Sequence, residues 1–128
     1  MTQPEKDTET RACGPILIVE DDEDTRETLR YLLEAEGHTV AGAIHGKDAL
    51  AWLAEGGRPC LILLDLMMPV MTGFELLAAL RADPKHAGTP VVLVSAWPDK
   101  AREATGIQGF LTKPFDFSEL LDYARRYC

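Results

Sequence analysis

Three short runs of apolar residues constrain the fold of this chain more than any other feature. They occupy residues 16–19, 61–64 and 91–94 and read ILIV, LILL and VVLV. Because every position in them is apolar, and not every second one, each run is typical of a strand covered on both faces. Such strands occur in parallel sheets with helices on either side, so the sequence predicts an α/β fold.

Amphipathic stretches alternate with these runs. Apolar residues recur at helical spacing over residues 23–36, 46–55, 73–82 and about 99–105, and then at Phe117, Leu120, Leu121 and Ala124 on one face of a last helix. Two weaker strand patterns cover residues 38–44 and 107–112. Five strand–helix units with right-handed crossovers favour a doubly wound, flavodoxin-like parallel sheet of order 2-1-3-4-5. We expect residues 15–128 to form this domain and the polar residues 1–14 to be a flexible tail.

Charge and hydropathy exclude several function classes. Asp and Glu number 21 against 13 Lys and Arg, and the net charge of −8 repels phosphate backbones, so nucleic acid is not an expected partner. No apolar run approaches the roughly 20 residues of a membrane span, and the polar start is not a secretory signal, so we expect a cytoplasmic protein without a membrane partner. Three scattered cysteines (13, 60 and 128) then predict free thiols.

Polar residues follow the strand patterns where ligands bind in such sheets, beyond the carboxyl ends of the strands. Glu20 and Asp21 follow the first strand, Asp65 the third, Ser95 the fourth and Lys113 the fifth. Crowded carboxylates repel one another, and a hard cation such as Mg²⁺ relieves that repulsion. A lysine supplies a point charge for a phosphoryl group, and an aspartate is a competent nucleophile. The pattern predicts a Mg²⁺-assisted aspartyl-phosphate site.

Four segments carry a resemblance to a known family. They are residues 16–26 (ILIVEDDEDTR), 61–73 (LILLDLMMPVMTG), 91–97 (VVLVSAW) and 109–116 (GFLTKPFD). In this order they resemble the receiver domain of two-component response regulators, from about Gly14 to the C-terminus. The chain resembles a single-domain, chemotaxis-regulator-like member, and we expect it to act without an output domain.

The resemblance implies a role for each matching acidic position. Asp65 corresponds to the phosphoacceptor of the family. Glu20 and Asp21 correspond to the acidic pair that holds Mg²⁺, and the backbone carbonyl of Met67 to a further ligand of the ion. Residues 22–24 are equally consistent with a simple helix start, since acids favour a helix N-terminus, and we expect that for them.

The same resemblance assigns the residues around the phosphoryl group. Ser95 and Lys113 match the hydroxyl and the ammonium that contact it, the bond from Lys113 to the next proline is cis in the family, and Phe110 stands at the aromatic switch position. Trp97 occupies a position that modulates spontaneous dephosphorylation, and its large indole predicts slow autodephosphorylation. The stretch from Ser95 to Lys113 is about one helical turn shorter than in the family, which predicts a stunted fourth helix.

The resemblance further implies partners and an alternative. A sensor histidine kinase or a phosphotransfer protein would supply the phosphoryl group, and the signal would leave through a downstream protein or a phosphorelay. The chain would be a phosphoacceptor and not an enzyme in its own right. The alternative is a receiver-like scaffold that binds its partner without phosphorylation, which metal titration and acetyl-phosphate labelling would distinguish.

Overall fold

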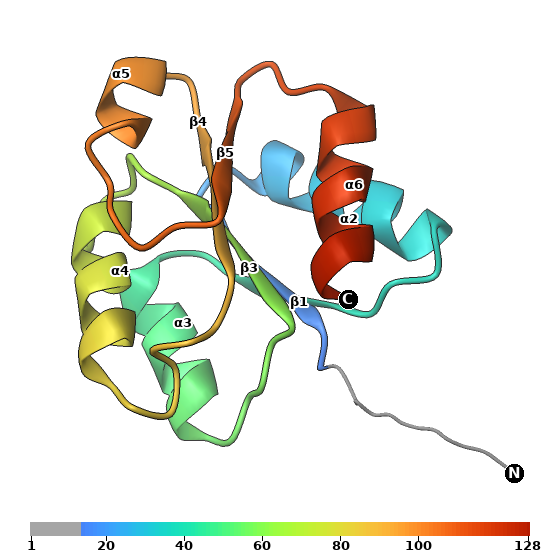
Figure 1. Ribbon diagram of the computed structural model, residues 1–128. Coiled ribbons are helices and arrows are strands. Elements are labelled where there is room, and N and C mark those ends of the chain that lie inside the picture. The colour runs from blue at the N-terminus through green and yellow to red at the C-terminus, as the bar shows by residue number, and fades with distance from the viewer. Residues whose placement is uncertain (1–13) are drawn as a thin grey trace, which may run out of the picture.

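The computed structural model describes residues 14–128, which form one parallel sheet with helices on both faces (Figure 1). The strands are β1 Ile16–Val19, β2 Val40–Ala43, β3 Leu61–Asp65, β4 Val91–Ser95 and β5 Gly109–Thr112. The helices are α2 Glu23–Ala35, α3 Gly46–Ala54, α4 Gly73–Ala82, α5 Pro98–Ala101 and α6 Phe117–Tyr127. The strand order β2-β1-β3-β4-β5 confirms the expected flavodoxin-like topology.

Two apolar clusters, one on each face of the sheet, form the core. Alternate residues of each central strand enter different clusters: in β1, Leu17 packs towards α3 and α4, whereas Ile18 packs towards α2 and α6. Figure 1 shows the same division, with α3, α4 and α5 over one face and α2 and α6 over the other. The wholly apolar runs are therefore explained by burial on both sides of the strands.

Local signals fix the helix ends. Asp22 caps α2 by accepting a hydrogen bond from the Thr25 backbone N–H, and α2 is followed by Gly37 with φ +91°. Thr72 and Glu75 form a capping box at the start of α4. None of the helices within residues 14–128 is long and apolar enough to span a bilayer.

The chain between β4 and β5 is compressed, as the short spacing predicts. Helix α5 is a single turn, and residues 102–108 follow it as loop. Arg81 of α4 holds this loop, because its Nε and Nη2 both donate to the carbonyl of Gly106, the former at 3.1 Å. Its Nη1 donates to the carbonyls of Ala87 and Thr89, which precede β4. The guanidinium of Arg81 thus holds the loop after α5 through backbone carbonyls. In a protein with a longer helix, the helical hydrogen bonds would order this segment.

One predicted helix face is buried only in part, and one expectation, that of free thiols, is wrong. Phe117 does not share the buried face of α6, because it lies in the first turn, directly after the cap Asp116, and its side chain is 39% exposed. Cys60 and Cys128 are not free thiols but form a disulfide. Their separation in sequence hides the pairing, since only the packing of α6 on the sheet brings them together. The expected tail, with Cys13, lies outside the described residues except for Gly14.

Candidate functional site

Three carboxylates meet at the carboxyl edge of the sheet. The register pairs Val19 of β1 with Leu64 of β3, so Glu20 and Asp65, one residue further along each strand, lie side by side. One carboxylate oxygen from each of Glu20, Asp21 and Asp65 falls within 4.8 Å of the others. Glu20 is 2% exposed and Asp65 is 6% exposed, whereas Asp21 faces solvent. The two buried members are therefore reached from the side of Asp21.

Lys113 is the cation of the cluster. Its Nζ lies 2.8 Å from Oε1 of Glu20 and 3.6 Å from Oδ1 of Asp65. Burial alone would lower the pKa of Lys113, but its hydrogen bond to Glu20 and the charges of both carboxylates raise it above its ordinary value. The lysine therefore stays protonated and pairs first with Glu20, which leaves Asp65 with the more distant contact.

The carboxyl group of Asp65 is harder to ionise than that of a free aspartate, because it is buried beside another carboxylate. Burial and then the nearby charge of Glu20 raise its pKa to about 7, although Lys113 and the backbone N–H of Met67 act in the opposite direction. At neutral pH its carboxyl group is thus divided between the neutral and the charged form. A carboxyl group poised in this way is typical of functional sites.

The donor set fits a hard divalent cation. It consists of carboxylate oxygens from three residues, two of them buried, with a single lysine to balance their charge. Oxygen ligands with an open, solvent-facing side suit Mg²⁺, which retains several waters when it binds. The geometry therefore satisfies the chemical requirement for the ion that the sequence predicts.

Glu20 is held by bonds that the sequence did not reveal. Arg26 of α2 donates to the backbone carbonyl of Glu20 at 2.9 Å, and the Asp22 backbone N–H donates to its Oε2 at 3.2 Å. Asp22 itself receives hydrogen bonds from Thr25, which lower the pKa of its exposed carboxyl group. Asp22 is therefore a helix cap, as expected, and Arg26 is an additional positioning residue of the site.

Ser95 lies beside the cluster, but its hydroxyl group is already hydrogen-bonded to the backbone of Trp97. It ends β4, is buried, and its Oγ accepts a hydrogen bond from the Trp97 backbone N–H at 2.9 Å. The Lys113 backbone N–H donates to the Ser95 carbonyl at 2.8 Å, which places these two predicted residues side by side. The Lys113–Pro114 bond is cis. Trp97 is 59% exposed.

The loop after Asp65 is tightly wound. Val70 has φ +70°, a left-handed conformation that is unusual for a β-branched residue, and the Met71 N–H donates to the Pro69 carbonyl at 2.7 Å. The loop ends at Gly73, where the backbone approaches Asp65 too closely for a side chain. A Cβ at this position would lie 2.6 Å from the carbonyl oxygen of Asp65. The MMPVMTG sequence thus encodes a turn that fixes the backbone around Asp65.

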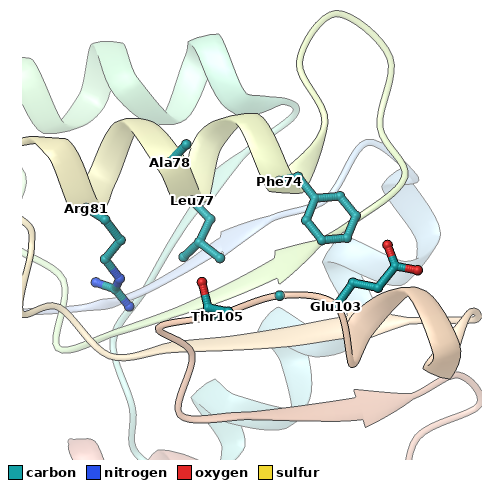
Figure 2. Close-up of a pocket in the computed structure, with 7 residues that line it drawn as sticks. Phe74, Leu77, Ala78, Arg81, Glu103 and Thr105 are labelled. Carbon is teal, nitrogen blue, oxygen red and sulfur yellow. The ribbon is translucent and has the colours of Figure 1, made fainter.

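Phe110 is not part of the cluster. It lies on β5 opposite Leu93 and is half-buried against the apolar cluster beneath α4. A separate hollow of about 240 Å³ lies between α4 and the loop after α5, where Figure 2 shows Phe74 and Glu103 at one end and Arg81 at the other. It follows from the shortened α5 and is distinct from the acidic edge.

Comparison with known proteins identifies the family to which this sequence and site are similar. The family model of the response regulator receiver domain matches residues 16–125. An uncharacterized 14.6 kDa protein of Leptolyngbya boryana is 40% identical over 124 residues, which cover 94% of each chain. The chain spans 48% of the length of an uncharacterized transcriptional regulatory protein of Bacillus subtilis, to which it is 40% identical over 112 residues.

Solved structures agree in fold. The chemotaxis protein CheY4 of Vibrio cholerae superposes with a TM-score of 0.80 at 34% identity, over 91% of this chain and 100% of that one. The receiver domain of a sensor histidine kinase of Pseudomonas aeruginosa, solved with a magnesium ion in its active-site cleft, gives 0.80 at 28% identity over 91% and 98% of the two chains. With its profile, fold and edge of carboxylates in agreement, the chain belongs to the response regulator receiver domain family of two-component signalling.

Proposed function

We propose that Asp65 accepts a phosphoryl group from the phosphohistidine of a sensor histidine kinase or a phosphotransfer protein. The observation that carries this proposal is the meeting of three carboxylates within 4.8 Å of one another beside a half-buried lysine. In the first step an Asp65 carboxylate oxygen attacks phosphorus, the P–N bond breaks, and its electron pair returns to the imidazole ring. Asp65 reacts as the carboxylate, so its proton leaves before the attack.

The neighbouring residues would hold the ion and the phosphoryl oxygens. Glu20, Asp21, Asp65 and the backbone carbonyl of Met67 would bind Mg²⁺, which supplies positive charge that favours the ionised acceptor and neutralises the phosphoryl oxygens. Lys113, whose Nζ lies 3.6 Å from Asp65, would balance the charge on a further phosphoryl oxygen. Positioning and electrostatics, and not a catalytic base, would then drive the transfer.

Phosphorylation would also exchange a hydrogen bond at Ser95. Its hydroxyl is bound to the turn at Trp97, and the phosphoryl group offers a charged acceptor in its place. Withdrawal of Ser95 would release that turn and disturb the packing of Phe110, which is only half-buried. The changed surface would bind a downstream protein in the cytoplasm or pass the phosphoryl group on. Phosphorylation shifts this equilibrium only through contacts that differ between the two states.

The first test is the intact mass after incubation with acetyl phosphate and Mg²⁺. We expect a gain of one phosphoryl group that EDTA prevents and that Asp65→Asn abolishes. Asp24→Asn is the matched control, because it removes an exposed carboxylate of the same acidic run outside the cluster, and it should be labelled normally. No gain in mass, with Mg²⁺ still bound, would instead support the scaffold alternative.

We further propose that Trp97 slows autodephosphorylation. Trp97 is exposed and its backbone N–H is bonded to Ser95, and from there its indole would obstruct a water approaching the phosphoryl group. Trp97→Ala should shorten the lifetime of the aspartyl phosphate by several-fold, measured as loss of the phosphorylated mass after removal of acetyl phosphate. Tyr31→Ala, which removes another exposed aromatic ring, should leave the lifetime unchanged. Equal lifetimes for Trp97→Ala and the unmodified sequence would refute the proposal.

A further inference from the structure

The amino edge of the sheet carries a covalent link that the proposed phosphoryl chemistry does not use. Cys60, directly before β3, is bonded to Cys128, directly after α6, across 68 positions of sequence. Asp65 ends the same strand. The link and the acidic cluster therefore occupy opposite ends of β3, and the link joins that strand to the last turn of α6.

Both cysteines are held in place by backbone contacts that do not depend on the bond. The Cys60 N–H donates to the Pro15 carbonyl at 3.0 Å, and the Cys128 N–H donates to the Ala124 carbonyl at 2.8 Å. The two Cα atoms lie 5.6 Å apart, within the usual range for a disulfide. Because the fold itself brings the two thiols together, the pair can open and close without unfolding.

The two cysteines line a hollow at the surface of the fold. Both cysteines are half-buried, and a hollow of about 160 Å³ opens onto them beside Gly14, Ile16 and His38. Thiol–disulfide exchange needs direct approach of a thiolate to a sulfur, which a fully buried bond prevents. The position of this bond thus permits exchange with small molecules.

The bond secures a part of α6 that the core holds less firmly. Leu120, Leu121 and Ala124 bury the middle of the helix on the sheet. Beyond them, Tyr127 is only partly buried, and Arg125 pairs with Glu36 at 3.7 Å in an exposed ion pair, which contributes little in water. A covalent anchor at the end of the helix therefore adds a further restraint on its last turn.

We propose that Cys60 and Cys128 form a reversible thiol–disulfide site that anchors the end of α6 to β3. The oxidant is a low-molecular-weight disulfide such as oxidised glutathione. One protein thiolate attacks it, forms a mixed disulfide and releases one small thiol. The second protein thiolate attacks the protein sulfur of that mixed disulfide and releases the other small thiol. Two electrons pass from the protein thiols to the oxidant, and the two protons end on the released thiols or in water.

The test uses the full, unphosphorylated chain, so its outcome does not depend on the chemistry at Asp65. Protein equilibrated in glutathione buffers from oxidising to reducing is quenched and alkylated, and its intact mass and peptides are measured. We expect one alkylated thiol, Cys13, on the oxidising side and three on the reducing side, with a reversible transition. Cys13→Ser should keep the transition, whereas Cys60→Ser and Cys128→Ser should each abolish it.

Hydrogen exchange and thermal unfolding report the anchoring. Reduction should speed amide exchange over residues 124–128 and lower the melting temperature by about 10 °C, as expected for opening a long covalent loop. Cys128→Ser should behave like reduced protein in both buffers. Three alkylated thiols under oxidising conditions, a disulfide to Cys13, a bond that excess dithiothreitol cannot open in the folded protein, or unchanged exchange in α6 would each overturn the proposal.

Discussion

The two ends of β3 are built on opposite principles. At its carboxyl end, Asp65 is 6% exposed and has a pKa of about 7, and the loop that follows holds Val70 in a left-handed conformation. At its amino end, Leu61 is fully buried and the preceding Cys60 is covalently joined to α6. One end of the strand keeps groups in states that cost stability, and the other end contributes stability.

The difference follows from the direction of a parallel sheet. Loops at the carboxyl ends of the strands converge on one edge and carry the functional groups, whereas the opposite edge mainly closes the fold. Buried charge and backbone strain persist only where the rest of the structure enforces them. Substitutions at the amino end should therefore lower stability without loss of function, and those at the carboxyl end should do the reverse.

Cys60→Ser should have the largest effect on stability. Opening a loop that spans 68 positions should lower the free energy of unfolding by about 4 kcal/mol under oxidising conditions, through the greater freedom of the unfolded chain. Urea unfolding measures the change, with Cys13→Ser as the control. The variant should still be labelled by acetyl phosphate at the normal rate. A large loss of labelling would show that the two ends of β3 are not separable.

Lys113→Met should have the largest effect on the chemistry. Loss of one preorganised charge from such a site typically slows the reaction by about 100-fold, and we expect that reduction in the rate of labelling. The pKa of Asp65 should rise further, because Lys113 is the charge that lowers it. Lys85→Met, at an exposed lysine beyond the other edge of the sheet, should label normally. Equal rates for the two variants would exclude Lys113 from the transfer.

The sequence predicted the carboxyl end of β3 better than the amino end. The proximity of Asp65 and Lys113 was predictable because apolar runs mark the strands, and residues that follow parallel strands must share an edge. The pairing of Cys60 with Cys128 depends instead on how α6 lies across the sheet, which no local pattern encodes. Topology alone determines proximity only in the first case, and the cysteines were therefore predicted to be free thiols.

Other differences between the sequence-based predictions and the structure also arise from packing that no local pattern encodes. Sequence analysis did not single out Arg81, since its contacts with the loop around Gly106 depend on the shortness of α5. Phe117 fits the helical period, but the first turn of α6 lies outside the buried stripe. Periodicity describes a helix as a whole and does not show where its packing on the sheet begins.

Asp65→Asn tests whether ionisation of the buried Asp65 carboxyl group lowers the stability of the fold as pH rises. The pKa of Asp65 is raised from 3.8 to about 7, so the folded protein holds a proton that the unfolded chain has lost, and stability falls as pH rises between these values. An asparagine does not titrate. In EDTA, the variant should gain stability relative to the unmodified sequence as pH rises, by about 2 kcal/mol at pH 8, a figure reduced from the full pKa shift to allow for residual hydration.

Denaturant unfolding at pH 5 and pH 8 measures this gain, and Asp24→Asn serves as the exposed control. The difference between Asp65→Asn and the unmodified sequence should be smaller at pH 5 than at pH 8. A difference that stays constant or shrinks with rising pH would mean that Asp65 is not held against its ionisation. The variant would then offer no support for the contrast between the two ends of β3.

Val70→Gly should have the smallest effect, a gain of about 1 kcal/mol in the free energy of unfolding. Glycine adopts φ +70° without the steric cost that a β-branched residue bears there, and this relief exceeds the added freedom of the unfolded chain. Little apolar burial is lost, because the Val70 side chain is 64% exposed. The midpoint of urea unfolding measures the gain.

Gly56→Ala provides the matched reverse change, since Gly56 has φ +104° in a turn with open space around it, and it should lower stability by about 1 kcal/mol. If Val70→Gly is stabilising, it should also weaken Mg²⁺ binding, because a looser turn positions the Met67 carbonyl less firmly. A variant that gained stability and kept full Mg²⁺ affinity would show that the strain at Val70 does not serve the site. A variant that lost stability would show that the turn is not strained.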